Sequence, residues 1–183
     1  TELFADKKNF RHFMLKEIYE QPEKTQLWID RFLPMNLSLE NSVTFPISTS
    51  TLEKVEQIQI LACGTSRHAG MVGAYLLEQF AGVTTKVFFA SEFRYSPPPL
   101  SANTLTIGVS QSGETADTLA ALKMEKERRE LTNDVNFSFH QLGITNRVDS
   151  SLGRELENVI DIGSGIEIGV AATKTFLGQM LSF

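Results

Sequence analysis

The stretch 105–119, LTIGVSQSGETADTL, constrains the fold more than any other part of the chain. Its apolar half, residues 105–109, ends abruptly at four polar or small residues, and a helical pattern starts at Glu114. This order predicts a buried strand, a tight polar turn and the first turn of a helix. Units of this kind build parallel sheets with helices across the faces, so we expect an α/β fold.

The polar turn has the chemistry of a compact anion site. The first N–H groups of a helix have no internal partner, and the helix dipole adds partial positive charge there. Ser110, Ser112 and Thr115 add hydroxyl donors, Gln111 adds an amide, and Gly113 lets the backbone approach a ligand. We therefore predict a phosphate site. The alternative is a turn that only caps the helix.

This turn matches neither of the common nucleotide-binding motifs. No Lys follows Gly113, and the turn holds one glycine where the dinucleotide fingerprint needs three. The lack of a nearby Lys or Arg favours a single phosphate, held by dipoles and hydroxyls, over a triphosphate.

A second unit of the same kind lies upstream. The apolar run 58–62 is followed by Cys63, Gly64, Thr65 and Ser66, and either hydroxyl is expected to cap a helix that reaches about residue 80. Because parallel strands end at one edge of a sheet, the two turns can converge on one ligand. Cys63 is expected to be a small buried residue rather than a nucleophile, since no base is recognisable nearby.

The rest of the chain completes a five-stranded pattern. Alternation of strands and helices predicts a three-layer α/β sandwich with a parallel, doubly wound sheet. The further strands are expected at 86–90, 141–145 and 158–162.

The connections are predicted in less detail. Residues 1–51 are expected to form an N-terminal helical arm and a linker, with Pro22 marking a break, and residues 52–183 the folded domain. The charge run 125–130 is expected on an exposed helix end, and 131–140 in a loop. A glycine-rich turn at 163–169 should precede a helix over 170–183.

Charge and composition exclude several classes of function. A net charge of −5 offers no basic face, which argues against nucleic acid as a partner. No apolar run reaches the roughly 18–20 residues of a membrane span. The single cysteine favours a reducing, cytoplasmic setting. Neither a metal nor a cofactor is expected. The chain starts at Thr1 and ends within an apolar segment, so we expect a fragment of a longer protein.

Six segments, in one order, carry a resemblance to a known family. They resemble the isomerase domain of glutamine–fructose-6-phosphate aminotransferase, also called glucosamine-6-phosphate synthase, from about Phe10 onward, with gaps at 34–51 and 131–140. SQSGET alone indicates only the wider sugar isomerase (SIS) class. KEIYEQPE and EIGVA narrow the resemblance from that class to this enzyme family. The segments are FRHFMLKEIYEQPE (10–23), LACGTSRHAG (61–70), ASEFRY (90–95), SQSGETADTL (110–119), GITN (143–146) and EIGVAATKTF (167–176).

The resemblance implies a fold, a reaction and a set of binding residues. The chain looks like the first of two SIS subdomains, with a flavodoxin-like strand order. The family converts fructose 6-phosphate to glucosamine 6-phosphate with ammonia released from glutamine. Val170 matches a position whose backbone contacts the sugar, and Ala172 replaces the Ser of many relatives. The residues that match the phosphate-binding positions are Thr65, Ser66, Ser110, Gln111, Ser112 and Thr115.

The resemblance also implies what lies elsewhere. The Glu, Lys and His that perform the proton and ring chemistry belong to the family's second SIS subdomain, so no catalytic residue is assigned here. The implied partners are that subdomain, a glutaminase domain and the sugar phosphate. We also expect a homodimer, because the aromatic arm and the open C-terminal helix need a partner surface. Two alternatives are a non-enzymatic sugar-phosphate sensor and a packing module whose turns bind nothing.

Overall fold

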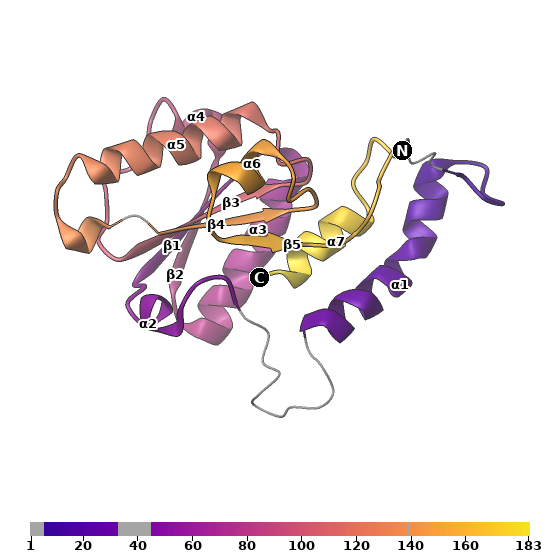
Figure 1. The fold of residues 1–183 in the computed structure, drawn as a ribbon, viewed down its shortest axis with the longest axis horizontal. Helices are drawn as coiled ribbons and strands as arrows, with labels where there is room; N and C mark the ends of the chain where they lie inside the picture. Colours follow the sequence, from indigo (N-terminus) through magenta and orange to yellow (C-terminus); the bar gives the residue numbers. More distant parts are fainter. Residues whose placement is uncertain (1–5, 33–44, 139) are drawn as a thin grey trace.

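The computed structural model describes residues 6–32, 45–138 and 140–183, and its centre is one five-stranded parallel sheet (Figure 1). The strands lie in the order β2-β1-β3-β4-β5, and every neighbouring pair is parallel. The predicted sheet and its flavodoxin-like order are confirmed. The strands are β1 (Gln57–Ala62), β2 (Thr84–Phe89), β3 (Thr104–Ser110), β4 (His140–Thr145) and β5 (Val159–Asp161).

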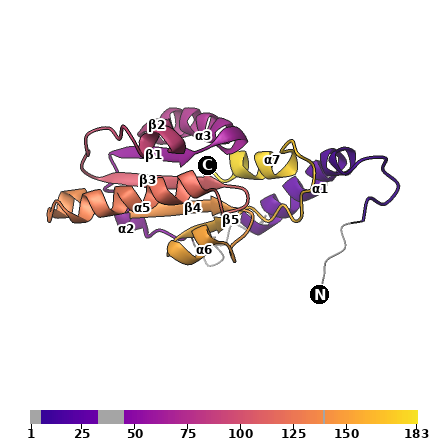
Figure 2. The same ribbon diagram turned by 90° about the horizontal axis from the view of Figure 1, so that it is seen from above.

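Helices cover both faces of this sheet (Figures 1 and 2). Because side chains alternate along a strand, Ile60 and Leu61 enter two different apolar clusters. The cluster with Ile60 lies on the side of α3 (Gly64–Leu76), the π-helical turn η2 (Leu77–Ala81) and α7 (Lys174–Leu181). The cluster with Leu61 lies under α4 (Ala90–Phe93), α5 (Ala116–Glu130) and α6 (Ser151–Glu155).

Strand β3 is the most deeply enclosed element. All seven of its residues are buried, as expected for a parallel strand with helices on both sides. Gly108 allows this close packing, because a Cβ there would lie 2.5 Å from a terminal methyl carbon of Leu122 on α5. The residue at the end of β3 is therefore held firmly in place.

The N-terminal arm corrects the expectation of a break at Pro22. Helix α1 (Phe13–Phe32) runs through this proline without ending. A proline leaves the carbonyl four residues earlier without its usual donor. Here the side-chain amide of Gln21 donates to that carbonyl, Ile18 O, at 3.1 Å and takes over the missing bond. The sequence alone did not indicate this local compensation.

Several boundaries also differ from the prediction. Helix α3 begins at Gly64 with Cys63 as its N-cap, so neither Thr65 nor Ser66 caps it. Helix α7 begins at Lys174, and residue 170 lies in the connection before it. Two short elements, α2 (Thr49–Leu52) and η3 (Val135–Phe137), lie within expected linker or loop segments. The rest of the linker expectation, over 34–44, lies outside the described residues.

The expectation that the charge run 125–130 lies on an exposed helix end is wrong for two of its residues, which are buried. Glu125 is 1% exposed and Arg129 is 3% exposed. Glu125 accepts hydrogen bonds from Gln59 Nε2 on β1 at 2.7 Å and from Arg129 Nε at 2.9 Å. Arg128 donates to the other carboxylate oxygen at 2.9 Å. The charges are retained inside because they satisfy one another.

This buried network generates a stability prediction. Replacing Arg129 by Met leaves the Glu125 carboxylate short of a partner, and we expect the free energy of unfolding to fall by about 3 kcal/mol. Lys126→Met, on the half-exposed side of the same helix, should change it by less than about 1 kcal/mol. Urea denaturation of the two variants measures the difference, and equal losses would contradict the account.

Candidate functional site

The structure places the two predicted turns next to each other. Ala62 at the end of β1 pairs with Val109 near the end of β3, so the turns that follow start from adjacent positions. From β1 the chain moves to β2 on one side, and from β3 it moves to β4 on the other. In open α/β sheets, ligands bind at such a reversal, outside the carboxyl ends of the two strands.

The turn after β3 is shaped by its own hydroxyl groups. Ser110 Oγ accepts a hydrogen bond from the Gly113 amide at 3.0 Å and lies 2.8 Å from Thr115 Oγ1. Ser112 Oγ accepts from the Glu114 amide at 3.2 Å. Ser110 is buried and Ser112 is exposed. The turn therefore presents the Ser112 hydroxyl to solvent, while the Ser110 hydroxyl is held inside by its hydrogen bonds.

These hydroxyls do not cap α5. Thr115 is the N-cap residue of α5, and its side chain makes no capping hydrogen bond. The first N–H groups of α5 are thus left without a side-chain acceptor, as an anion site requires. This geometry favours the ligand-binding interpretation of the turn over the capping one.

Gly113 also brings this turn into contact with α6. Its φ of +66° favours glycine, and a Cβ there would lie 1.9 Å from Ser150 Oγ. Its carbonyl accepts from the Leu152 amide at 3.0 Å. The glycine therefore lets the turn pack against the start of α6.

Glu114 is also held by α6. Its carboxylate accepts a hydrogen bond from the Ser151 amide at 2.9 Å. The Ser151 hydroxyl and amide lower the pKa of Glu114, and the charges of Arg154 and Arg147 lower it further. The negative charge of this exposed residue is thus engaged at α6 and not at the N-terminus of α5.

The turn after β1 offers a second set of donors. Thr65 is exposed, and Ser66 Oγ accepts a hydrogen bond from Gln179 Nε2 of α7 at 2.9 Å. A hydroxyl that accepts such a bond still has its own proton to donate to a ligand. The guanidinium of Arg67 lies over the Phe89 ring at 3.8 Å, so the cation of this turn is directed toward β2.

Val170 belongs to neither of the two turns. It is fully exposed, in the connection between β5 and α7. The adjacent amides of Ile168 and Gly169 donate to the carboxylate of Glu17 on α1 at 2.6 and 3.0 Å. Within the described ranges, the hydrogen bonds of 167–170 run to α1 and to the start of α7, and none reaches the two turns.

Sequence reasoning missed the residues that hold this segment. Glu17 is 1% exposed, and its partners lie 151 and 152 residues away in the chain. Glu167 accepts from the amide and hydroxyl of Thr173 at 3.0 and 2.9 Å, and from Thr175, at the start of α7. A glutamate on an amphipathic helix carries no local signal of such distant partners.

Neither a metal-binding cluster nor a membrane-spanning helix is present among the described residues. No cluster of three or more His, Cys, Asp or Glu side chains in the described part of the chain is arranged to hold a metal ion. None of the helices described there is both long and apolar enough to span a membrane.

Comparison with known proteins relates the fold to a family. Residues 51–183 match the family model described as the SIS domain. A glutamine–fructose-6-phosphate aminotransferase of Thermosynechococcus vestitus is 52% identical over 99% of this chain. That of Aquifex aeolicus is 46% identical over 96%. The chain spans 29% and 27% of the length of these two relatives.

Solved structures agree with this relationship. The C-terminal domain of glucosamine-fructose-6-phosphate aminotransferase from Francisella tularensis superposes with a TM-score of 0.81 at 38% identity. The alignment covers 96% of this chain and 46% of that one. A glucosamine-6-phosphate deaminase from Thermotoga maritima, at 24% identity and a TM-score of 0.68 over 93% of this chain and 47% of that one, shares the fold.

The Glu17 contacts predict a local effect on the segment before Val170. Glu17→Ala leaves two part-buried amide donors without their acceptor, which should cost about 2 kcal/mol of stability. Hydrogen exchange at Ile168 and Gly169 should then accelerate more than exchange in the sheet. Glu23→Ala, at an exposed site on the same helix, is the control and should leave these amides unchanged. Unaltered protection in the Glu17 variant would refute the assigned role.

The contacts of Glu114 predict a pH effect. Because its folded-state pKa is lowered, the charged carboxylate stabilises the fold above the unfolded-state pKa. This contribution is lost as the pH falls through the lowered folded-state pKa. A carbon-detected NMR titration should place the Glu114 midpoint below that of glutamate in an unstructured peptide, and Ser151→Ala should raise it. A midpoint that Ser151→Ala leaves unchanged would contradict this assignment.

Proposed function

The chain belongs to the SIS domain family, and from this membership we propose that it is the sugar-phosphate-binding first half of the isomerase part of a glutamine–fructose-6-phosphate aminotransferase. The observation that carries the proposal is the adjacency of two hydroxyl-rich turns at the ends of β1 and β3. Relatives with that name align with 96–99% of the chain, which supports the choice of enzyme. In this proposal residues 1–51 are an arm and linker, and 52–183 the SIS subdomain.

The proposed ligand group is the phosphate of fructose 6-phosphate or glucosamine 6-phosphate. A phosphate monoester carries nearly two negative charges at neutral pH and accepts several hydrogen bonds. Hydroxyls from both turns and the uncapped start of α5 would surround it with neutral donors, which give orientation more than raw charge attraction. The proposed binding residues are Thr65, Ser66, Ser110, Gln111, Ser112 and Thr115.

The sugar itself would extend toward the connection before α7. We assign Val170 a backbone contact with the sugar, and Glu17 holds the neighbouring amides that position it. Ala172 has no hydroxyl, so a side-chain hydrogen bond at that position is left out of the proposal.

In the reaction, this half would act as an anchor. Fixing the phosphate lets binding energy hold the reactive carbons where acid–base groups can reach them. The second SIS subdomain would supply the proton chemistry and a glutaminase domain the ammonia, and both would lie outside this chain. We therefore assign no catalytic residue here.

The remaining assignments follow from the same identification. We propose a homodimer, which the exposed Met71, Tyr75 and Phe80 on α3 and η2 support. We propose a cytoplasmic location, in keeping with the single, unpaired cysteine. The sensor alternative is less well supported, because the relatives named above are aminotransferases.

Ligand titration tests the proposed function. Adding fructose 6-phosphate should shift the amide resonances of 110–116 and Ser66, whereas fructose without phosphate should not. Changing Ser110 and Ser112 together to Ala should weaken binding at least tenfold, since two charge-assisted hydrogen bonds are lost. Ser96→Ala, at an exposed serine before the proline run, is the matched control. Absence of shifts at millimolar ligand, or equal affinity of the double variant, would contradict the proposal.

A further inference from the structure

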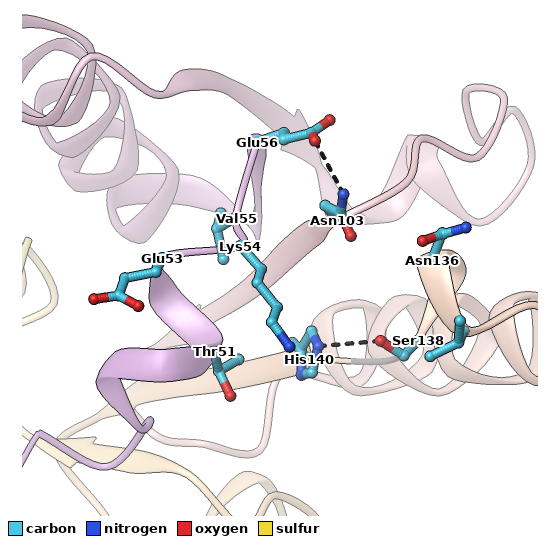
Figure 3. A pocket seen from close by; sticks show the side chains of 10 residues that line it. Thr51, Glu53, Lys54, Val55, Glu56, Asn103, Asn136, Ser138 and His140 are labelled. Carbon is cyan, nitrogen blue, oxygen red and sulfur yellow. Dashed lines mark hydrogen bonds between the residues drawn. The ribbon is translucent and has the colours of Figure 1, made fainter.

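A cavity of about 580 Å³ lies at the end of the sheet opposite the two turns. It is formed where β1 and β4 begin, between the segment after α2 and the connection that leads from α5 through η3 to β4 (Figure 3). Nothing in the proposed sugar-phosphate site uses its residues, so its chemistry can be considered separately.

The cavity is lined by Lys54, a lysine for which the described residues provide no ion-pair partner. Lys54 extends toward His140, as Figure 3 shows. Of the two nearby glutamates, Glu56 accepts a hydrogen bond from Asn103 Nδ2 at 3.0 Å, and Glu53 points away in the same view. Among the residues with described positions, no carboxylate forms an ion pair with Lys54.

His140, at the start of β4, lines the same cavity as Lys54. Burial lowers the pKa of His140, and the charges of Arg129 and Lys54 lower it further. Arg129 reaches it from α5, where Glu125 is its ion-pair partner, and Lys54 comes from the segment after α2. The Ser138 hydroxyl lies 3.1 Å from His140 Nε2. An anion between Lys54 and His140 would relieve the repulsion and favour the protonated imidazole.

Donors for such an anion come from both walls of the cavity. Asn136 and Ser138 line the η3 side of the cavity, and each carries a group that can donate. In Figure 3 the Ser138 hydroxyl lies beside His140. A tetrahedral oxyanion has enough acceptor atoms to reach an ammonium, an imidazolium and a hydroxyl at once. A planar carboxylate has only two oxygens to share among them.

We propose that this cavity is a second anion site, which binds a phosphate group between Lys54 and His140. It differs in kind from the neutral cradle at the other end of the sheet, because its attraction comes from charged side chains. Binding should therefore strengthen as His140 becomes protonated and weaken with added salt. The proposal does not depend on the proposed function of the two turns.

NMR titration of the 183-residue chain tests it, with the His140 ring as the reporter. Inorganic phosphate, added at constant ionic strength against sodium chloride, should raise the pKa of His140 by about one unit, which corresponds to roughly tenfold tighter binding to the protonated ring. Lys54→Gln should weaken binding about tenfold. Lys86→Gln, which removes an exposed lysine from β2, should leave binding unchanged.

Glucose 6-phosphate provides a second arm and separates the possible sources of the phosphate group. A tighter dissociation constant than that of inorganic phosphate assigns the site to phosphate esters, and an equal one assigns it to phosphate itself; both support the proposal. A His140 pKa that follows chloride alone, or equal effects of Lys54→Gln and Lys86→Gln, would overturn it. Shifts at 110–116 report on the other site, so failure at one site is distinguishable from failure at the other.

Discussion

The parallel pairing of β1 with β3 is the interaction on which the proposed site depends. It brings two turns, separated by almost fifty residues of sequence, to adjoining positions, because Gln57–Ala62 runs in register beside 104–109. The pairing is fixed by burial on both faces of β3 and by the missing Cβ of Gly108, which lets α5 pack closely. A slip of one residue would turn every core side chain to the opposite face, so the register is strongly specified.

The two turns are held by contacts that do not involve every donor of the proposed site. The turn after β3 uses Ser110 Oγ to hold its own backbone, and Gly113 to pack against α6. The N-cap residue of α5 makes no side-chain cap, so the first N–H groups of this helix have no side-chain acceptor there. A site that is already ordered before binding loses less conformational entropy when a ligand arrives. The fold therefore holds the two turns of the proposed site in place, and the first N–H groups of α5 stay without a side-chain acceptor.

The sequence predicted the sheet and the two turns because their signals are local. Apolar runs that stop at Ser, Thr and Gly residues indicate the strand ends, and alternation with helices indicates a parallel sheet. The features that the sequence did not predict depend on partners that are distant in the chain, or on one side chain that replaces a lost hydrogen bond. Glu125 on α5 is buried beside Gln59, which lies on strand β1. Glu17 is buried beside amides more than 150 residues later in the chain. Pro22 looked like a break because the Gln21 amide that replaces the lost donor leaves no pattern in the sequence.

The most direct test of the central claim is a crystal structure of the chain with fructose 6-phosphate. The account predicts phosphate oxygens within about 3 Å of hydroxyls from both turns, Ser66 on one side and Ser112 or Thr115 on the other. A phosphate that touches only one turn, or that occupies only the cavity between Lys54 and His140, would contradict the assignment of the two turns as the sugar-phosphate site.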